Sequence, residues 1–217
     1  DLHYNVNACR KFKIFESCSV STAVSAGSFS AFAVAQCVAY SGSNVNAQDY
    51  VQWSNTVKSY LTVCDNGNYM RVQSGAIEGK LLVEYYSSDF EPLSTKLIDN
   101  ELPIFGAFYD SGNNYYVLSG QENPKQNDSL EVFRITKYDK NWNKIKSCGL
   151  YGANTTVPFD AGSARMTHSG DHLLVRTCHE MYKSSDGNNH QSNVTIEVDM
   201  PSMTITDSYT GVMNVED

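Results

Sequence analysis

The segments VEYYSSDFEPLSTKLI (83–98), ITKYDKNWNKIKSCGL (135–150) and IEVDMPSMTITDSYTG (196–211) share one design. Each begins as a strand of alternating residues, passes through a polar turn that ends in a large side chain, and continues as a second strand. The large side chains are those of Phe90, Trp142 and Met203. Because the same hairpin returns at intervals of roughly 50–60 residues, the sequence predicts a repeated β-structure.

Two further strands precede each of these hairpins. Apolar strands that follow a turn are predicted at 66–74, 113–121 and 170–179, and shorter strands come before them at 58–65, 105–110 and 162–169. Four antiparallel strands per unit are typical of a β-propeller blade, because such a sheet buries both faces only between neighbouring blades. The sequence thus predicts an all-β, propeller-like fold with blades at about 58–99, 103–150 and 161–212. A two-layer β-sandwich is the alternative.

The first part of the chain, residues 1–56, is less regular than the rest. Alternating residues between Phe32 and Tyr40 predict strands there, and these form either a fourth, degenerate blade or an N-terminal arm. Three or four blades ending near Asp217 predict an incomplete ring. Exposed strands of such a ring would pair with a protein partner or with copies of the same chain.

The composition excludes several classes of protein. Fourteen Tyr and nine Phe among polar turns favour strands, whereas a net charge of −8 without a Lys/Arg run excludes nucleic-acid binding. The partly apolar stretch from Val20 to Tyr40 is interrupted by Ser, Thr and Gln, so no membrane insertion is expected. No GxSxG elbow, phosphate-binding glycine loop or HExxH motif supports catalysis.

Cysteines and glycosylation sequons indicate a secreted or cell-surface protein. An even number of scattered cysteines without CxxC spacing favours disulfides over a metal site, and no cofactor is implied. The disulfide candidates are Cys9, Cys18, Cys37, Cys64, Cys148 and Cys178, with fifteen possible pairings. The predicted glycosylation sites are Asn127, Asn154 and Asn193. The chain shows no signal peptide at residue 1, which fits a processed protein.

The longest hairpin, CHEMYKSSDGNNHQSN (178–193), is the first candidate for a functional site. Its candidate ligand-binding residues are His179, Asp186, His190 and Gln191. They would converge on a polar ligand or a cation, or a histidine would serve as a general base. The favoured alternative is structural, because Asp-Gly-Asn is a common turn solution whose loop the His and Gln side chains would hydrogen-bond.

A pair of arginines is the second candidate. Arg165 and Arg176 fall on the first two strands of the last unit, where they would bind a carboxylate or a sulfate. Pairing with Asp160 or Glu180 across blades is an equally good interpretation.

Other side chains are of types that often occur in functional sites, although their spacing in the sequence matches no known motif. The carboxylates Asp110 and Glu122 and the histidines His168 and His172, which flank a tight turn, belong to this group. Four aromatic side chains would suit stacking on sugar rings, although most of them are expected in the blade cores: Trp53, Tyr109, Tyr115 and Trp142.

The run LYGANTTVPFDAGSARM (150–166) and the block 169–199 resemble an uncharacterised propeller-like repeat family of secreted or cell-surface proteins of gut-type bacteria. The resemblance extends from about Ala31 to the C-terminus and is strongest over 150–199. It implies a fold and no particular activity.

Together these features predict an extracellular, non-enzymatic propeller module that binds a protein partner or a glycan, or that assembles with itself. The alternative is a glycan-active hydrolase or lyase that uses the hairpin at 178–193. A central pocket with two carboxylates or three metal ligands would favour the enzyme.

Overall fold

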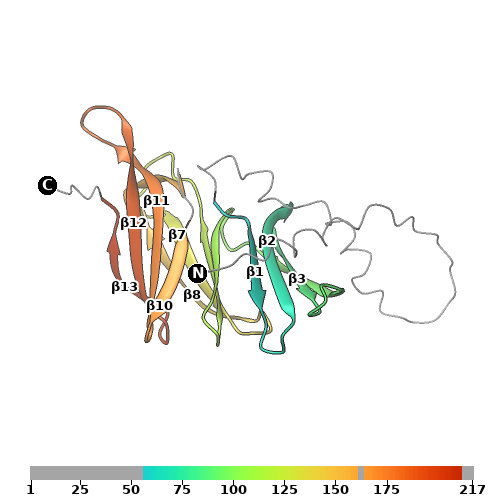
Figure 1. Cartoon of the computed structure of the whole chain (residues 1–217). Helices are drawn as coiled ribbons and strands as arrows, with labels where there is room; N and C mark the ends of the chain where they lie inside the picture. Colours follow the sequence, from blue (N-terminus) through green and yellow to red (C-terminus); the bar gives the residue numbers. More distant parts are fainter. Residues whose placement is uncertain (1–55, 161–163, 212–217) are drawn as a thin grey trace, which may run out of the picture.

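The computed structural model describes residues 56–160 and 164–211, which form strands and turns without a helix. Three antiparallel sheets follow one another along the chain (Figure 1). The first sheet contains β1 (Ser59–Val63), β2 (Tyr69–Ile77), β3 (Lys80–Tyr86) and β4 (Pro92–Asp99). The second contains β5 (Ile104–Asp110), β6 (Tyr115–Gly120), β7 (Glu131–Tyr138) and β8 (Lys144–Tyr151). The third contains β10 (Arg165–Ser169), β11 (His172–Lys183), β12 (Asn189–Asp199) and β13 (Thr204–Tyr209). The all-β prediction is confirmed.

The four strands named for each sheet are paired in sequence order, because consecutive strands among them are joined by hairpins. The last turn of each sheet has the same backbone: the large residue adopts a positive φ of 65° in Phe90, 63° in Trp142 and 49° in Met203. In the second sheet, Asp139 accepts hydrogen bonds from the amides of Asn141 and Asn143 and thereby fixes the turn. The repeated motif of the sequence is therefore a repeated turn conformation, in which a large residue occupies a position that usually favours glycine.

Two apolar cores lie between the three sheets, because each strand sends alternate side chains to opposite faces. The core between the first and second sheets is built from Met70, Val72, Leu81, Val83, Phe105, Phe108, Tyr115, Val117, Tyr138 and Trp142. The core between the second and third sheets includes Tyr116, Leu118, Phe133, Ile135, Phe159, Leu173, Val175, Val194, Ile196, Val198 and Met203. The second sheet is thus covered on both faces, and the structure has three layers where a two-layer sandwich would have two.

Close backbone packing at the second sheet explains the small residues of that region. A Cβ atom on Gly106 would lie 2.4 Å from the Phe159 ring, and one on Gly120 would lie 2.8 Å from the same ring. Phe159 itself has a positive φ of 62° and is 4% exposed. The Phe159 ring therefore packs against the backbone of Gly106 and Gly120, where a larger residue would clash with it.

The outer faces of the first and third sheets differ. On the first sheet, large exposed side chains flank a buried centre of Gln73, Leu82 and Glu84. These exposed side chains are Leu61, Val63, Leu93 and Leu97. On the third sheet, β11 alternates between exposed and buried side chains, and its outward residues are mainly polar. The outer face of the first sheet thus combines exposed apolar side chains with buried polar ones, whereas the outer face of the third sheet is mainly polar.

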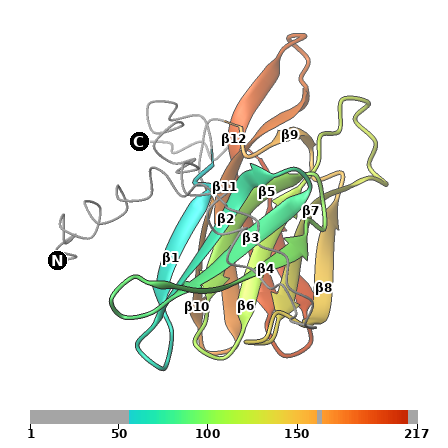
Figure 2. The ribbon, with the colours of Figure 1, turned by 90° about the vertical axis from the view of Figure 1, so that its right-hand side faces the viewer.

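Two features of the third sheet were not predicted. A short strand, β9 (Thr155–Pro158), pairs with the upper part of β11, which makes this sheet five-stranded. The hairpin of β11 and β12 is long because its strands are long, and its turn at 184–188 is tight (Figure 2). The expected N-terminal blade or arm at 1–56 lies almost entirely outside the described residues.

Candidate functional site

The tip of the β11–β12 hairpin is a turn held together by its own polar side chains. Asp186 accepts hydrogen bonds from the amide of Asn188 at 2.9 Å and from the hydroxyl of Ser184 at 3.2 Å. His190 Nε2 lies 2.8 Å from the second carboxylate oxygen of Asp186. The Asn188 amide, followed by His190, lowers the pKa of Asp186 to about 2. Asp186 and His190 thus stabilise the turn, as the structural alternative predicted.

His179 is a buried residue of β11. It is 0% exposed, on the inner face of β11, and its Nδ1 lies 2.7 Å from the hydroxyl of Thr155 on β9. Burial lowers the pKa of His179 to about 4, against a smaller opposing effect of the Thr210 backbone. The imidazole is therefore neutral at pH 7 and hydrogen-bonds β9 to β11, and ligand binding by His179 stays a prediction.

Gln191 lies apart from both the turn and His179. Its Nε2 donates a hydrogen bond of 2.6 Å to Oδ2 of Asp160, which follows the end of β9. The four hairpin candidates therefore do not converge on one ligand. Within the part of the chain that the structure describes, no group of three His, Cys, Asp or Glu residues is arranged to hold a metal ion.

The two candidate arginines are direct neighbours. Arg165 on β10 pairs in register with Arg176 on β11, so both side chains leave the same outer face of the third sheet. Both are exposed. Arg176 Nη1 donates to the Thr195 hydroxyl on β12 at 2.6 Å, and Arg165 Nη1 donates to the carbonyl of Ala164 at 3.2 Å. The structure thus brings together two residues that the sequence only assigned to adjacent strands.

The alternative of an interblade ion pair is not realised for these arginines among the described residues. Asp160 accepts from Gln191, and Glu180 Oε1 accepts from the hydroxyl of Thr156 at 2.7 Å. Burial raises the pKa of Tyr60 on β1 to about 12, and the charge of Arg165 opposes this rise to a smaller extent.

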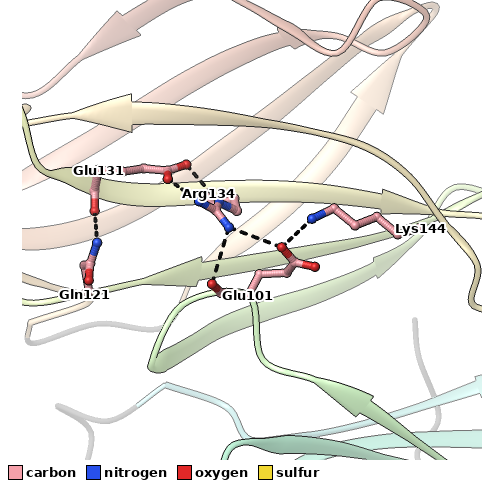
Figure 3. A network of polar contacts seen from close by, with 5 residues as sticks. All are labelled: Glu101, Gln121, Glu131, Arg134 and Lys144. Atoms are coloured by element: carbon pink, nitrogen blue, oxygen red, sulfur yellow. Dashed lines mark hydrogen bonds and ion pairs between the residues drawn. The ribbon is translucent and has the colours of Figure 1, made fainter.

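The other described arginines are ion-paired to glutamates. Arg71 Nε lies 2.6 Å from Oε2 of Glu84, which is buried. Arg134 bonds both carboxylate oxygens of Glu131 and lies 3.2 Å from Glu101, which also binds Lys144 (Figure 3). The hydrogen bond to Glu131 is the main cause of the raised pKa of Arg134. Arg71 and Arg134 are therefore structural, in contrast to the Arg165–Arg176 pair.

A cross-strand row extends from the arginine pair over the whole third sheet. The registers join Arg165 to Arg176, Arg176 to Thr195, and Thr195 to Tyr209, one residue from each of the four strands. Tyr209 is 44% exposed. Thr195 and Tyr209 were missed by sequence reasoning, which did not combine the strand registers.

Most of the remaining candidates have structural roles. Asp110 Oδ1 accepts the Gly112 amide and pairs with Lys140 at 2.7 Å, while Glu122 is an exposed residue. Tyr115 and Trp142 are buried in the first core, so they are not platforms for sugars. The stacking candidate Trp53 lies outside the described residues.

The histidines flanking the β10–β11 turn do not face each other, because they leave opposite faces of the sheet. His168 Nδ1 lies 2.7 Å from the hydroxyl of Tyr109 on β5, so it connects the second and third sheets. His172 Nδ1 lies 2.6 Å from Glu197 on β12, on the outer face.

Three of the predicted disulfide cysteines, Cys64, Cys148 and Cys178, are free thiols in the structure. They follow or belong to strands of three different sheets, β1, β8 and β11. Burial raises the pKa of Cys148 to about 11 and also raises that of Cys64. Cys9, Cys18 and Cys37 lie outside the described residues.

The three sequon asparagines lie at different depths. Asn127 and Asn154 are exposed in turns, whereas Asn193 is half-buried on β12 opposite Cys178. Asn127 Oδ1 accepts the Ser129 amide, and Asn154 Oδ1 accepts the Tyr182 amide. Glycosylation of these sites stays a prediction.

Comparison with known proteins gives only distant structural neighbours. No protein-family model and no curated protein matches the sequence. A solved structure of the apocarotenoid oxygenase of Synechocystis matches with a TM-score of 0.45 and 10% identity over 71% of this chain and 38% of that chain. The lignostilbene dioxygenase of Pseudomonas brassicacearum gives 0.43 and 8%, over 72% and 38%. A GH43 β-1,3-galactosidase with galactodeoxynojirimycin gives 0.38 and 12%, over 70% and 45%.

This chain thus spans less than half the length of these neighbours. No helix of the described residues is long and apolar enough to cross a membrane.

Proposed function

We propose that this chain is an extracellular, non-enzymatic propeller-type module that binds a glycan on the outer face of its third sheet. In this proposal the three sheets are successive blades of a propeller-like ring, with β1, β5 and β10 as inner strands. The contact of β5 with β10 and of β8 with β13 supports such an order, because equivalent strands of neighbouring sheets lie side by side.

The observation that carries the proposal is the row of Arg165, Arg176, Thr195 and Tyr209 on an exposed face. Sugar hydroxyls need many donors and acceptors at short spacing, and a sugar ring packs well on an aromatic side chain. The row offers guanidinium donors, a hydroxyl and an exposed aromatic ring on adjacent strands, which lie about 4.8 Å apart.

A glycan fits this face better than a protein partner does. Its large exposed hydrophobic side chains are Leu174 and Tyr209, which are 39% and 44% exposed. The neighbouring positions Gln191, Asn193 and Glu197 are polar. Protein interfaces usually bury a central apolar or aromatic cluster, whereas this face is polar through its centre.

Binding is tested with the full chain against an array of plant, animal and bacterial glycans, followed by affinity electrophoresis on polysaccharides. We expect retardation by at least one polysaccharide, without release of reducing ends or unsaturated sugars. A blank array and unretarded migration on every polysaccharide would overturn the glycan proposal. Release of sugar products would instead establish the hydrolase or lyase alternative.

A matched pair of variants locates the binding face. Thr195→Val removes the central hydroxyl of the row but keeps the side-chain shape, and we expect up to about tenfold weaker binding. Thr62→Val makes the same change on β1 of the first sheet and should leave binding unchanged. Equal affinity of both variants would place the binding site elsewhere.

A further inference from the structure

We infer that Arg165 and Arg176 together form a subsite for one oxyanion of an acidic glycan, a uronate carboxylate or a sulfate group. This inference rests on the proposed function and adds the charge of the ligand and the residues that select it. Its basis is the cross-strand pairing of the two arginines on the exposed face of β10 and β11.

Two like charges directly opposite each other weaken a strand pair. The protein carries a net charge of −8 and has more acidic than basic residues, so carboxylate partners are plentiful in its sequence. Arg71 and Arg134 have such partners at 2.6 Å and 3.2 Å. Arg165 and Arg176 have no carboxylate of the described residues within ion-pair distance, and they bond the neutral oxygens of Ala164 and Thr195.

Glu180 and Glu197 show that this placement is specific. Both lie on the same outer face, yet their carboxylates are engaged elsewhere: Glu180 Oε1 with Thr156 and Glu197 Oε1 with His172 at 2.6 Å. Among the residues that the structure describes, neither of these two carboxylates therefore forms an ion pair with Arg165 or Arg176.

The geometry suits an oxyanion with two or three oxygens. Directly opposed residues of antiparallel strands have Cβ atoms about 4.5–5.5 Å apart. Two guanidinium forks at this spacing can each donate to a different oxygen of one carboxylate or sulfate. Thr195 holds Arg176 Nη1 at 2.6 Å, which orients one of the forks before the ligand arrives.

The position of Tyr209 in the row favours an anion that is carried by a sugar. Tyr209 lies two strands beyond Arg176, so its exposed ring is roughly 10 Å from the arginine pair along the row. An oligosaccharide can place an acidic group on the arginines and a neighbouring ring over the tyrosine. A free inorganic anion would use the arginines alone.

The test uses affinity electrophoresis and calorimetry on the full chain with four probes: polygalacturonate, its fully methyl-esterified form, a sulfated galactan and an unsulfated galactan. The first and third carry the anion, and the second and fourth are their neutral counterparts. The variant is Arg165→Gln with Arg176→Gln. Its control is Lys125→Gln with Lys183→Gln, which removes the same charge at two exposed lysines outside the row.

We expect the wild type and the lysine control to bind an anionic probe at least tenfold more tightly than its neutral counterpart. The arginine variant should lose about tenfold per arginine and bind the charged and neutral probes alike. Its urea midpoint should equal or exceed that of the wild type, because a like-charge pair has been removed. Preference for polygalacturonate identifies a uronate, and preference for the sulfated galactan identifies a sulfate ester.

The inference is overturned if the arginine variant and the lysine control bind the anionic probes equally, since the attraction would then be due to general charge. It is also overturned if the wild type binds charged and neutral probes equally well, in which case glycan binding itself stands. If the wild type binds none of the four probes and the array is blank, the proposed function fails as well.

Discussion

The large residue with a positive φ in the last turn of each sheet permits an unusual prediction about Trp142. Its ring is 4% exposed and packs against the rings of Phe108, Tyr115 and Tyr138, with centroids at 5.7, 4.8 and 5.5 Å. Its Nε1 donates to the Tyr85 hydroxyl at 3.2 Å. Replacement of a buried Trp by Ala costs about 3–5 kcal/mol, so Trp142→Ala should be strongly destabilised.

Replacement of Trp142 by Gly removes one carbon more but should be less harmful. At a φ of 63°, any residue with a Cβ pays about 1–2 kcal/mol, which glycine does not pay. Glycine loses roughly 0.4–1 kcal/mol through the greater freedom of its unfolded chain. The difference leaves Trp142→Gly more stable than Trp142→Ala by about 0.5–1 kcal/mol.

The measurement is urea unfolding of both variants by far-UV circular dichroism, at equal temperature and with m-values compared. The control pair is Ser147→Ala and Ser147→Gly on β8, a residue without a positive φ. There glycine should be less stable than alanine by about 0.5–1 kcal/mol. If glycine is also the less stable of the two at position 142, the backbone reasoning for the repeated turn is refuted.

Three further predictions concern Gly106, His179 and Arg134. Gly106→Ala should cost about 1–3 kcal/mol, because the new Cβ would lie 2.4 Å from the Phe159 ring, and Phe159→Leu in the same chain should recover part of this loss in a double-mutant cycle. The free energy of unfolding should fall by on the order of 3 kcal/mol as the pH decreases from 6.5 to about 4, because the unfolded chain protonates His179 while the folded chain does not. His179→Gln should flatten this part of the pH profile. An unchanged profile would contradict the lowered pKa of His179. Arg134→Lys should destabilise by about 1–3 kcal/mol in thermal unfolding, since a compact ammonium group cannot reproduce the two-point guanidinium contact with Glu131 and reach Glu101 as well. A variant as stable as the wild type would show that the network contributes little.

Much of the fold was predictable from the sequence because alternation and turn chemistry are local signals. The motif around Trp142 repeats around Phe90 and Met203, and the structure places all three in equivalent turns. By contrast, β9 is only four residues long and pairs with the far end of β11. A strand that short, stabilised by tertiary contacts, leaves little periodicity to detect.

The candidate site was partly predictable for the same reason. The tight turn after Ser169 pairs that residue with His172, and counting back along both strands pairs Arg165 with Arg176. The same parity puts His179 on the inner face with Val175, so its burial could have been foreseen. The pairing of Tyr209 could not, because a register shift between Glu197 and Val198 interrupts the count along β12 and β13.

The turn residues also give the molecule a direction. Trp142 of the second sheet fills the core shared with the first sheet, and Met203 of the third fills the core shared with the second. Phe90 of the first sheet stacks on Tyr69 at 4.4 Å, on the side away from the second sheet. Each unit therefore carries the side chain that closes the seam toward the unit before it. A gene segment that encodes four strands and this turn could be duplicated or deleted as one unit, since every copy contributes the side chain that fills the core shared with the preceding sheet.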